Sequence, residues 1–177
     1  MTEKQKIRQH IKTEISAIDA KVKAEKSTLI FNQIIELQPF REAATVALYA
    51  ALADEPQTAD FIRWAAAHKR IVLPRIDGDE MDFYPYSQES MQRGTFGIDE
   101  PQSDERISPA EIDLIIVPGR AFTLQGKRLG RGRGYYDRYM AQEGFRATKI
   151  GVCYKEQLVE EIPDEPHDIL MERIIYA

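Results

Sequence analysis

The sequence predicts an α/β fold: a single three-layer α/β/α domain over residues 1–177, with a mostly parallel, Rossmann-like sheet and an N-terminal pair of helices. Two observations predict this fold. Short apolar, partly β-branched segments alternate with helical segments, which is the pattern of βα units built around a parallel sheet. The length of 177 residues suits one domain, and no linker or internal repeat divides the chain.

Apolar spacing predicts the N-terminal helices. Apolar side chains recur at intervals of three and four residues, which aligns them on one helix face: Ile7, Ile11, Ile15, Ile18 and Val22. Lys4 and Arg8 lie four residues apart and share a face, for which a solvated flank is the simplest interpretation. A second helix is expected over residues 28–37, ending before Pro39.

Five apolar segments are expected to form strands. They read as continuous apolar runs, as the buried strands of a parallel sheet do, and they comprise residues 45–51, 71–73, 112–117, 149–154 and 173–176. Pro74 is expected to end the second strand. Residues 81–86 are expected to pair back on it after a turn at 77–79.

Two further helices complete the alternation. One is expected over residues 59–68, with Thr58 as its N-cap and Trp64 in the core. The other is expected over residues 135–142, after a glycine-rich segment. Residues 87–109 are polar and show no clear pattern.

Composition excludes several classes of protein. No apolar run approaches 18 residues and no secretory leader is visible, so no membrane association is expected. Cys153 is the only cysteine, which rules out an intrachain disulfide and favours a cytoplasmic location. The net charge of −5 weakly disfavours a nucleic-acid partner, because such proteins usually carry a basic excess. We expect a monomer.

The charge is unevenly distributed. Residues 120–138 contain six basic residues and one acid, a net charge of +5, whereas the remaining 18 basic and 28 acidic residues give −10. Four of the ten glycines lie in the same segment. Alternate glycines let backbone N–H groups face an anion, and arginines add bidentate donors suited to phosphate. Asp137 follows them, where a carboxylate could hold Mg²⁺ against phosphate oxygens.

The segment therefore predicts a phosphate site, although it is neither a Walker A loop nor a good dinucleotide fingerprint. Ligands of open α/β sheets bind beyond the carboxyl ends of the strands, which places the site among loops 51–57, 118–134 and 154–168. Two alternatives stay open at this point. One is a nucleic-acid-binding Gly/Arg patch, and the other is a sugar-phosphate isomerase or transferase on a similar scaffold.

The segment 117–140, VPGRAFTLQGKRLGRGRGYYDRYM, closely resembles the signature of the 5-formyltetrahydrofolate cyclo-ligase family, also called methenyltetrahydrofolate synthetases. Further elements match in family order: the Lys4/Arg8 pair, the strand and acidic turn at 49–58, the IVLPR strand at 71–75, Gly-x-x-Glu-Pro at 97–101, and a late strand with His-Asp at 149–168.

The resemblance implies ATP- and Mg²⁺-dependent cyclisation of 5-formyltetrahydrofolate to 5,10-methenyltetrahydrofolate, with release of ADP and phosphate. The formyl oxygen would be phosphorylated, and N10 would then attack the activated carbon. The partners are thus two small molecules, ATP and the folate, without nucleic acid. No Ser/His/Asp triad is needed, and none is evident.

The resemblance also implies the site residues. ATP would be bound by the N-terminal pair and the loop: Lys4, Arg8, Arg128, Leu129, Gly130, Arg131, Gly132, Arg133, Gly134, Tyr135 and Tyr136. The folate would meet Ala50, Glu55, Phe96, Arg131, Gly132, Arg133, Gly134 and Tyr135, with Arg131, Arg133 and Tyr135 as the catalytic candidates. The Mg²⁺ ligands would be Asp137 and Asp168.

Simpler interpretations stand beside these roles. Asp168 could be a loop cap, with Asp164 or Glu165 as the metal ligand instead. Glu55 could be an ordinary turn acid, and Phe96 could pack in the core.

The sequence departs from the family pattern at two positions. Thr123 stands where an Asp is usual, and Arg120 adds a charge where a small or apolar residue is common. Thr123 can accept hydrogen bonds but carries no charge, so we expect it to support the loop without touching the ligands.

Overall fold

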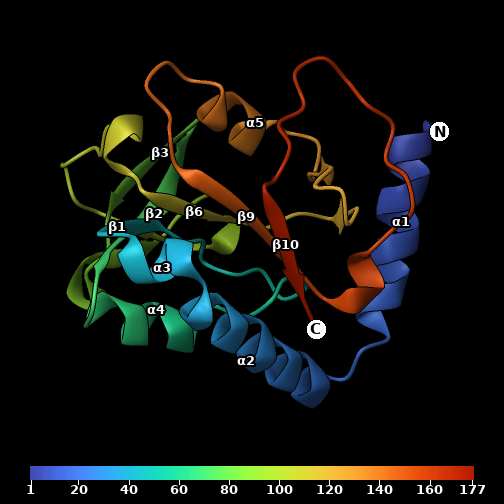
Figure 1. Cartoon of the computed structure of the whole chain (residues 1–177), viewed down its shortest axis with the longest axis horizontal. Helices are drawn as coiled ribbons and strands as arrows, with labels where there is room; N and C mark the ends of the chain where they lie inside the picture. Colours follow the sequence, from blue (N-terminus) through green and yellow to red (C-terminus); the bar gives the residue numbers. More distant parts are fainter.

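A computed structural model describes residues 1–177. A six-stranded sheet forms its centre, in the order β10-β9-β6-β1-β2-β3 (Figure 1). The strands are β1 (Thr45–Ala47), β2 (Arg70–Asp77), β3 (Glu80–Pro85), β6 (Leu114–Val117), β9 (Thr148–Cys153) and β10 (Arg173–Tyr176). Every neighbouring pair is parallel except β2 with β3, which form an antiparallel hairpin. The predicted α/β class with a mostly parallel sheet is confirmed.

Helices lie on both sides of the sheet. They are α1 (Glu3–Ser16), α2 (Ala20–Glu36), α3 (Gln38–Glu42), α4 (Ala59–Ala66) and α5 (Tyr135–Met140). In Figure 1, α2, α3 and α4 lie below the strands, α5 lies above them, and α1 stands beside the β10 edge. None of these helices is both long and apolar enough to cross a lipid bilayer.

Successive side chains of a strand point to opposite faces of the sheet, so the core is divided into two clusters, one on each face. In β6, Leu114 and Ile116 join a cluster with α1, α2, α3 and α4, whereas Ile115 and Val117 join a second cluster with α5. All four side chains are fully buried, which explains why this strand reads as a continuous apolar run.

Short elements complete the chain. Two small antiparallel hairpins pair β4 (Met91–Arg93) with β5 (Asp99–Pro101) and β7 (Ala121–Phe122) with β8 (Arg128–Leu129). Four 3₁₀ helices connect larger elements: η1 (Gln88–Ser90), η2 (Thr95–Gly97), η3 (Pro109–Glu111) and η4 (Lys155–Gln157). The polar segment that showed no sequence pattern thus contains the β4–β5 hairpin.

The N-terminal helices divide differently from the prediction. The expected apolar stripe spans two helices, because α1 ends at Ser16 and the Asp19 side chain caps α2 by accepting from the Lys21 N–H at 2.7 Å. Val22 therefore lies on α2, where it is exposed. The second helix begins eight residues earlier than expected, at Ala20.

Three local predictions were wrong. Pro74 does not end its strand: β2 runs on to Asp77, and Pro74 pairs with Phe83 of β3. The side chain of Thr58 does not cap α4, because its hydroxyl donates to the Tyr49 carbonyl oxygen at 2.6 Å. Trp64 is 42% exposed and not in the core.

Candidate active site

A cavity of about 640 Å³ opens at the carboxyl ends of the parallel strands. All three expected loops contribute to its lining, through residues such as Glu55, Arg131 and Asp168. The β2–β3 hairpin and the β4–β5 hairpin contribute as well, the latter with Phe96, which was expected at the site. The N-terminal turns of α1 close the remaining side with Lys4 and Arg8.

The glycine- and arginine-rich loop follows β8 and leads into α5. Gly132 and Gly134 have φ values of 109° and 70°, in the left-handed region that favours glycine. Arg128 is buried beneath this loop, where its Nη1 donates to the Pro118 carbonyl oxygen at 3.0 Å and its Nη2 lies 3.5 Å from an oxygen of Asp137. Burial lowers the pKa of Arg128, and the Asp137 charge opposes that shift. Arg128 thus supports the loop from below.

Arg131 joins two acids of the turn after β1. Its Nη2 bonds to the Asp54 carboxylate, and its Nε and Nη2 lie 3.2 and 3.1 Å from Oε1 of Glu55. Arg120 holds the same Asp54 from the other side, with Nη1 2.5 Å from Oδ2. Arg120, one of the two residues that depart from the family pattern, therefore anchors Asp54, the acid that holds Arg131.

Glu55 is only 5% exposed and does more than an ordinary turn acid. Its Oε2 accepts the Leu52 N–H at 2.9 Å, and its carbonyl oxygen accepts the Tyr154 hydroxyl at 2.9 Å. Burial raises the pKa of Glu55, and the Arg131 charge and the Leu52 N–H offset this only in part. The structure brings Glu55 and Arg131 together in the cavity wall.

Lys4 and Arg8 are not a solvated flank of α1. The Arg8 Nε donates to the Gly130 carbonyl oxygen at 2.9 Å, which ties the helix to the loop. The Lys4 ammonium lies 3.2 Å from Glu165 and 3.5 Å from Asp168. Both basic side chains therefore face the cavity, as expected.

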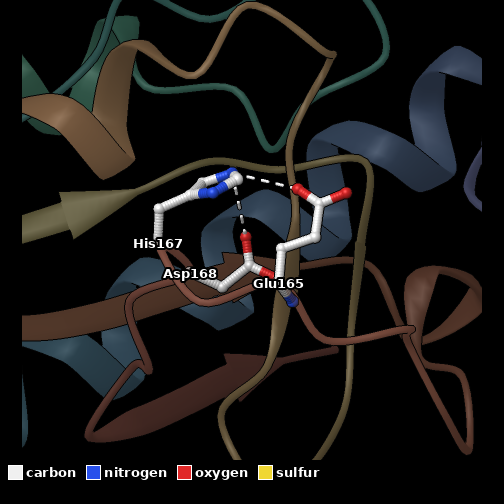
Figure 2. A group of neighbouring side chains, drawn as sticks. All are labelled: Glu165, His167 and Asp168. Atoms are coloured by element: carbon white, nitrogen blue, oxygen red, sulfur yellow. Dashed lines mark hydrogen bonds and ion pairs between the residues drawn. The ribbon is translucent and has the colours of Figure 1, made fainter.

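Carboxylates gather at the Lys4 side of the cavity. Asp137 Oδ1 accepts the Ile169 N–H at 3.4 Å, which places Asp137 beside Asp168. Asp168 Oδ2 also accepts the Glu165 N–H at 2.9 Å, as the loop-cap interpretation of Asp168 expects. Figure 2 shows His167 pointing toward the carboxylates of Glu165 and Asp168, and these three residues could hold a metal ion together.

Part of the cavity lining is apolar. It includes Ala50, Ile76, Met81 and Phe96; Phe96 is 53% exposed, and its ring centre lies 5.6 Å from the Arg133 guanidinium. The core-packing interpretation of Phe96 is therefore wrong. Phe96 is also the only non-glycine residue with positive φ, at 61°.

Three further predicted residues have defined positions. The Tyr135 hydroxyl donates to the Gly78 carbonyl oxygen at 3.0 Å, so this ring lines the cavity with its hydroxyl tied to the β2–β3 turn. Tyr136 also lines the cavity, and Leu129 lies beside it with Gly130. Thr123 is buried and does not line the cavity: its hydroxyl accepts the Lys127 N–H at 3.2 Å, which supports the β7–β8 turn.

The residues of the site that were not predicted from the sequence include two acids. Asp54 lies between Arg120 and Arg131. Glu100 of β5 is 7% exposed and lines the cavity. The Gly-x-x-Glu-Pro element at 97–101 marked the place of Glu100 in the sequence but suggested no role for it.

The parallel sheet, with a glycine- and arginine-rich loop at the carboxyl ends of its strands, defines a Rossmann-like α/β protein of the kind that handles phosphorylated ligands. Comparison with known sequences identifies the group more closely. The chain belongs to the 5-formyltetrahydrofolate cyclo-ligase family, whose sequence profile matches residues 1–177.

Individual relatives agree with this assignment. A probable 5-formyltetrahydrofolate cyclo-ligase of Schizosaccharomyces pombe is 34% identical, over 85% of this chain and 83% of the relative. The NMR structure of Aquifex aeolicus 5,10-methenyltetrahydrofolate synthetase superimposes with a TM-score of 0.89 at 30% identity, covering 99% of this chain and 90% of the other. A Mycoplasma pneumoniae synthetase gives a TM-score of 0.80 at 27% identity, covering 98% of both chains.

Proposed function

We propose that this chain, as one domain, converts 5-formyltetrahydrofolate to 5,10-methenyltetrahydrofolate and couples the reaction to cleavage of ATP to ADP and phosphate. The observation that carries the proposal is the shared cavity, in which the glycine- and arginine-rich loop and the acid Glu55 face the same space. Such a cavity offers donors for a triphosphate and acceptors for an amino-bearing heterocycle next to each other. Family membership supports the same reaction.

The chemistry explains why ATP is required. The N5-formyl group is an amide, so its carbon is a poor electrophile and its oxygen a poor leaving group. Transfer of the γ-phosphoryl group to that oxygen gives an imidate-type phosphate. N10 then attacks the carbon and loses its proton, and phosphate departs with the former formyl oxygen. N10 belongs to the same molecule, so ring closure benefits from a high effective concentration.

The side chains of the loop would bind and orient the phosphates. In this proposal Arg131 turns from Asp54 and Glu55 to the transferring phosphoryl group, while Arg133 and the backbone N–H groups of Gly132 and Gly134 contact its oxygens. Lys4 and Arg8 bind the remaining phosphates from α1. Preorganised positive charge of this kind stabilises the transition state of phosphoryl transfer. The Tyr135 ring packs beside the formyl end of the folate.

The carboxylates fit a magnesium ion. Mg²⁺ prefers carboxylate oxygens, and Asp137, Asp168 and Glu165 present them together at one side of the cavity. The Lys4 ammonium already lies against Glu165 and Asp168, so this position favours positive charge. We propose Asp137 and Asp168 as the ligands. When bound, the ion would neutralise charge on the phosphates.

The partners in this proposal are small molecules only, and the chain acts as a monomer in the cytoplasm. The buried, unpaired Cys153 agrees with a reducing compartment. The basic loop folds against α1 and the sheet, and the rest of the chain is acidic, with a net charge of −10 outside residues 120–138. A long polyanion would be repelled by most of this surface.

One assay tests the proposal. The purified chain is mixed with 5-formyltetrahydrofolate, MgCl₂ and ATP, and formation of the strongly absorbing methenyl product is followed. We expect product only when ATP is present, and chelation of Mg²⁺ should stop its formation. Absence of ATP-dependent product would refute the proposal. Salt-sensitive RNA binding in its place would favour a nucleic-acid-binding module.

A further inference from the structure

The carboxylate of Glu100 is buried in the cavity wall without a counter-charge. It is 7% exposed, and it takes part in none of the ion pairs of the chain, whereas Glu55 pairs with Arg131. Burying a carboxylate is costly unless hydrogen-bond donors or positive charges compensate. The protein supplies one donor, the Ile76 N–H, at 2.9 Å from Oε2.

The second oxygen of Glu100 is available to a ligand. Oε1 has no hydrogen-bond partner in the chain, and it is not among the fully buried side-chain atoms that lack one, so it keeps some exposed surface on a residue that lines the cavity. A carboxylate offers about four acceptor positions. Glu55 has three of them filled, by two N–H groups of Arg131 and one of Leu52, while Glu100 has one filled.

The hairpin around Glu100 is built to hold this side chain. Glu100 pairs with Gln92 across β4 and β5, and Gly94 packs directly against its carboxylate. A Cβ at Gly94 would lie 1.9 Å from Oε1, so a larger residue at that position would push the Glu100 carboxylate aside. The same hairpin carries Phe96, an exposed residue with positive φ that also lines the cavity.

The chemistry of the surroundings points to a flat, amino-bearing heterocycle. Ile76, Met81 and Ile98 line the cavity near Glu100 and offer apolar contact to ring faces. A pterin has an amino group and ring N–H groups on more than one edge, and a single carboxylate can face only one of these edges. We infer that Glu100 is a second acid that binds the N–H groups of the pterin, beside Glu55; this inference rests on the proposed function.

Glu100→Gln tests the inference. The amide keeps an oxygen for the Ile76 N–H but replaces the other acceptor with a donor, which would oppose a pterin N–H. We expect the KM and the Kd for 5-formyltetrahydrofolate to rise about 10- to 100-fold, the effect of losing a charge-assisted hydrogen bond. The KM for ATP and the thermal midpoint should stay close to those of the unaltered chain. Asp99→Asn, an exposed position on the same strand, is the matched control and should change neither constant.

A substrate analogue provides a second measurement that does not depend on the stability of the variant. A 5-formyl folate lacking the 2-amino group should bind the unaltered chain more weakly than the parent compound. In Glu100→Gln the Kd values of the two folates should be nearly the same. Three results for Glu100→Gln would overturn the role of Glu100. They are an unchanged KM for the folate, an unchanged ratio between the Kd values of the two folates, and a change in the KM for ATP alone. A chain that neither binds the folate nor converts it would instead overturn the proposed function.

Discussion

The Arg131 guanidinium lies against the buried carboxylate of Glu55, with Nε and Nη2 3.2 and 3.1 Å from Oε1. Arg131 was expected to bind ATP as well as the folate, and Glu55 to bind the folate, yet without ligands the two side chains pair with each other. Burial alone would lower the pKa of Arg131, but hydrogen bonding to Asp54 and the charge of Glu55 raise it. The contact offsets the two charges in the cavity wall, and in the proposed function a phosphate and the pterin replace it.

Arg131→Ala should lower turnover by at least about 100-fold, because it removes a preorganised donor for the transferring phosphoryl group. It should also leave Glu55 buried without its counter-charge. Initial rates at saturating ATP and folate check this. Arg41→Ala, at an exposed arginine that pairs only with Glu36, is the control and should keep full activity. A rate within threefold of the unaltered chain, in a folded variant, would remove Arg131 from the site.

Arg120→Ala should lower kcat about 10-fold while the KM values change little, since Asp54 would lose the anchor that fixes its position beside Arg131. Only 13% of the Arg120 side chain is exposed, so this ion pair is less screened by solvent than most on the surface. Arg120→Lys should restore part of the rate because it keeps the charge. Equal kcat values for the unaltered chain, Arg120→Ala and Arg120→Lys would show that Arg131 is positioned without the contact between Arg120 and Asp54.

Phe96→Gly should separate stability from ligand binding. Phe96 has φ 61° and ψ 18°, a conformation that costs a non-glycine residue about 1 kcal/mol or more. Its ring is half-exposed, so little core packing is lost on replacement. We expect an unchanged or slightly higher free energy of unfolding in urea, together with a several-fold rise in the folate KM. Phe96→Ala keeps the strain but loses the ring; if it binds folate as the unaltered chain does, the ring does not contact the folate.

Asp113→Asn should reduce stability at neutral pH and lose this effect in acid. The Thr45 N–H lowers the pKa of Asp113; partial burial opposes the shift, and the Ala44 N–H and Arg146 add to it. A lowered carboxyl pKa contributes stability that is present above the unfolded value of about 3.9 and is lost as the pH falls through the folded value.

Urea unfolding at several pH values checks the Asp113 prediction. The difference between the two proteins should be about 1 kcal/mol at pH 7, small because the group is partly solvent-screened, and should shrink below about pH 4. A difference independent of pH would mean that the charge of Asp113 contributes nothing.

Local signals predicted most of the fold. The run at 112–117 could be recognised because both of its faces are buried, and 173–176 forms β10 as expected. Pro74 misled the prediction because β2 extends past β1, which pairs only with residues 70–72 of β2. Beyond that point the strand has one neighbour, so a residue without an N–H is tolerated. A single side-chain cap, Asp19, divided the N-terminal helices.

The site was less predictable because its contacts join distant parts of the chain. The glycine pattern and family signature located the loop, but the pairing of Arg131 with residues 76 and 77 positions earlier depends on the folded sheet. Glu100 could not be singled out, since its burial follows from how the β4–β5 hairpin packs against β2. An acid of this kind is indistinguishable in sequence from any solvated glutamate.

The central claim is that the formyl oxygen is phosphorylated and leaves as phosphate. The most direct measurement uses 5-formyltetrahydrofolate labelled with ¹⁸O in the formyl group, incubated with the chain, Mg²⁺ and ATP, followed by mass spectrometry of the phosphate released. We expect one labelled oxygen in each phosphate and one phosphate for each methenyl product. Unlabelled phosphate, with the label released into water, would contradict the account.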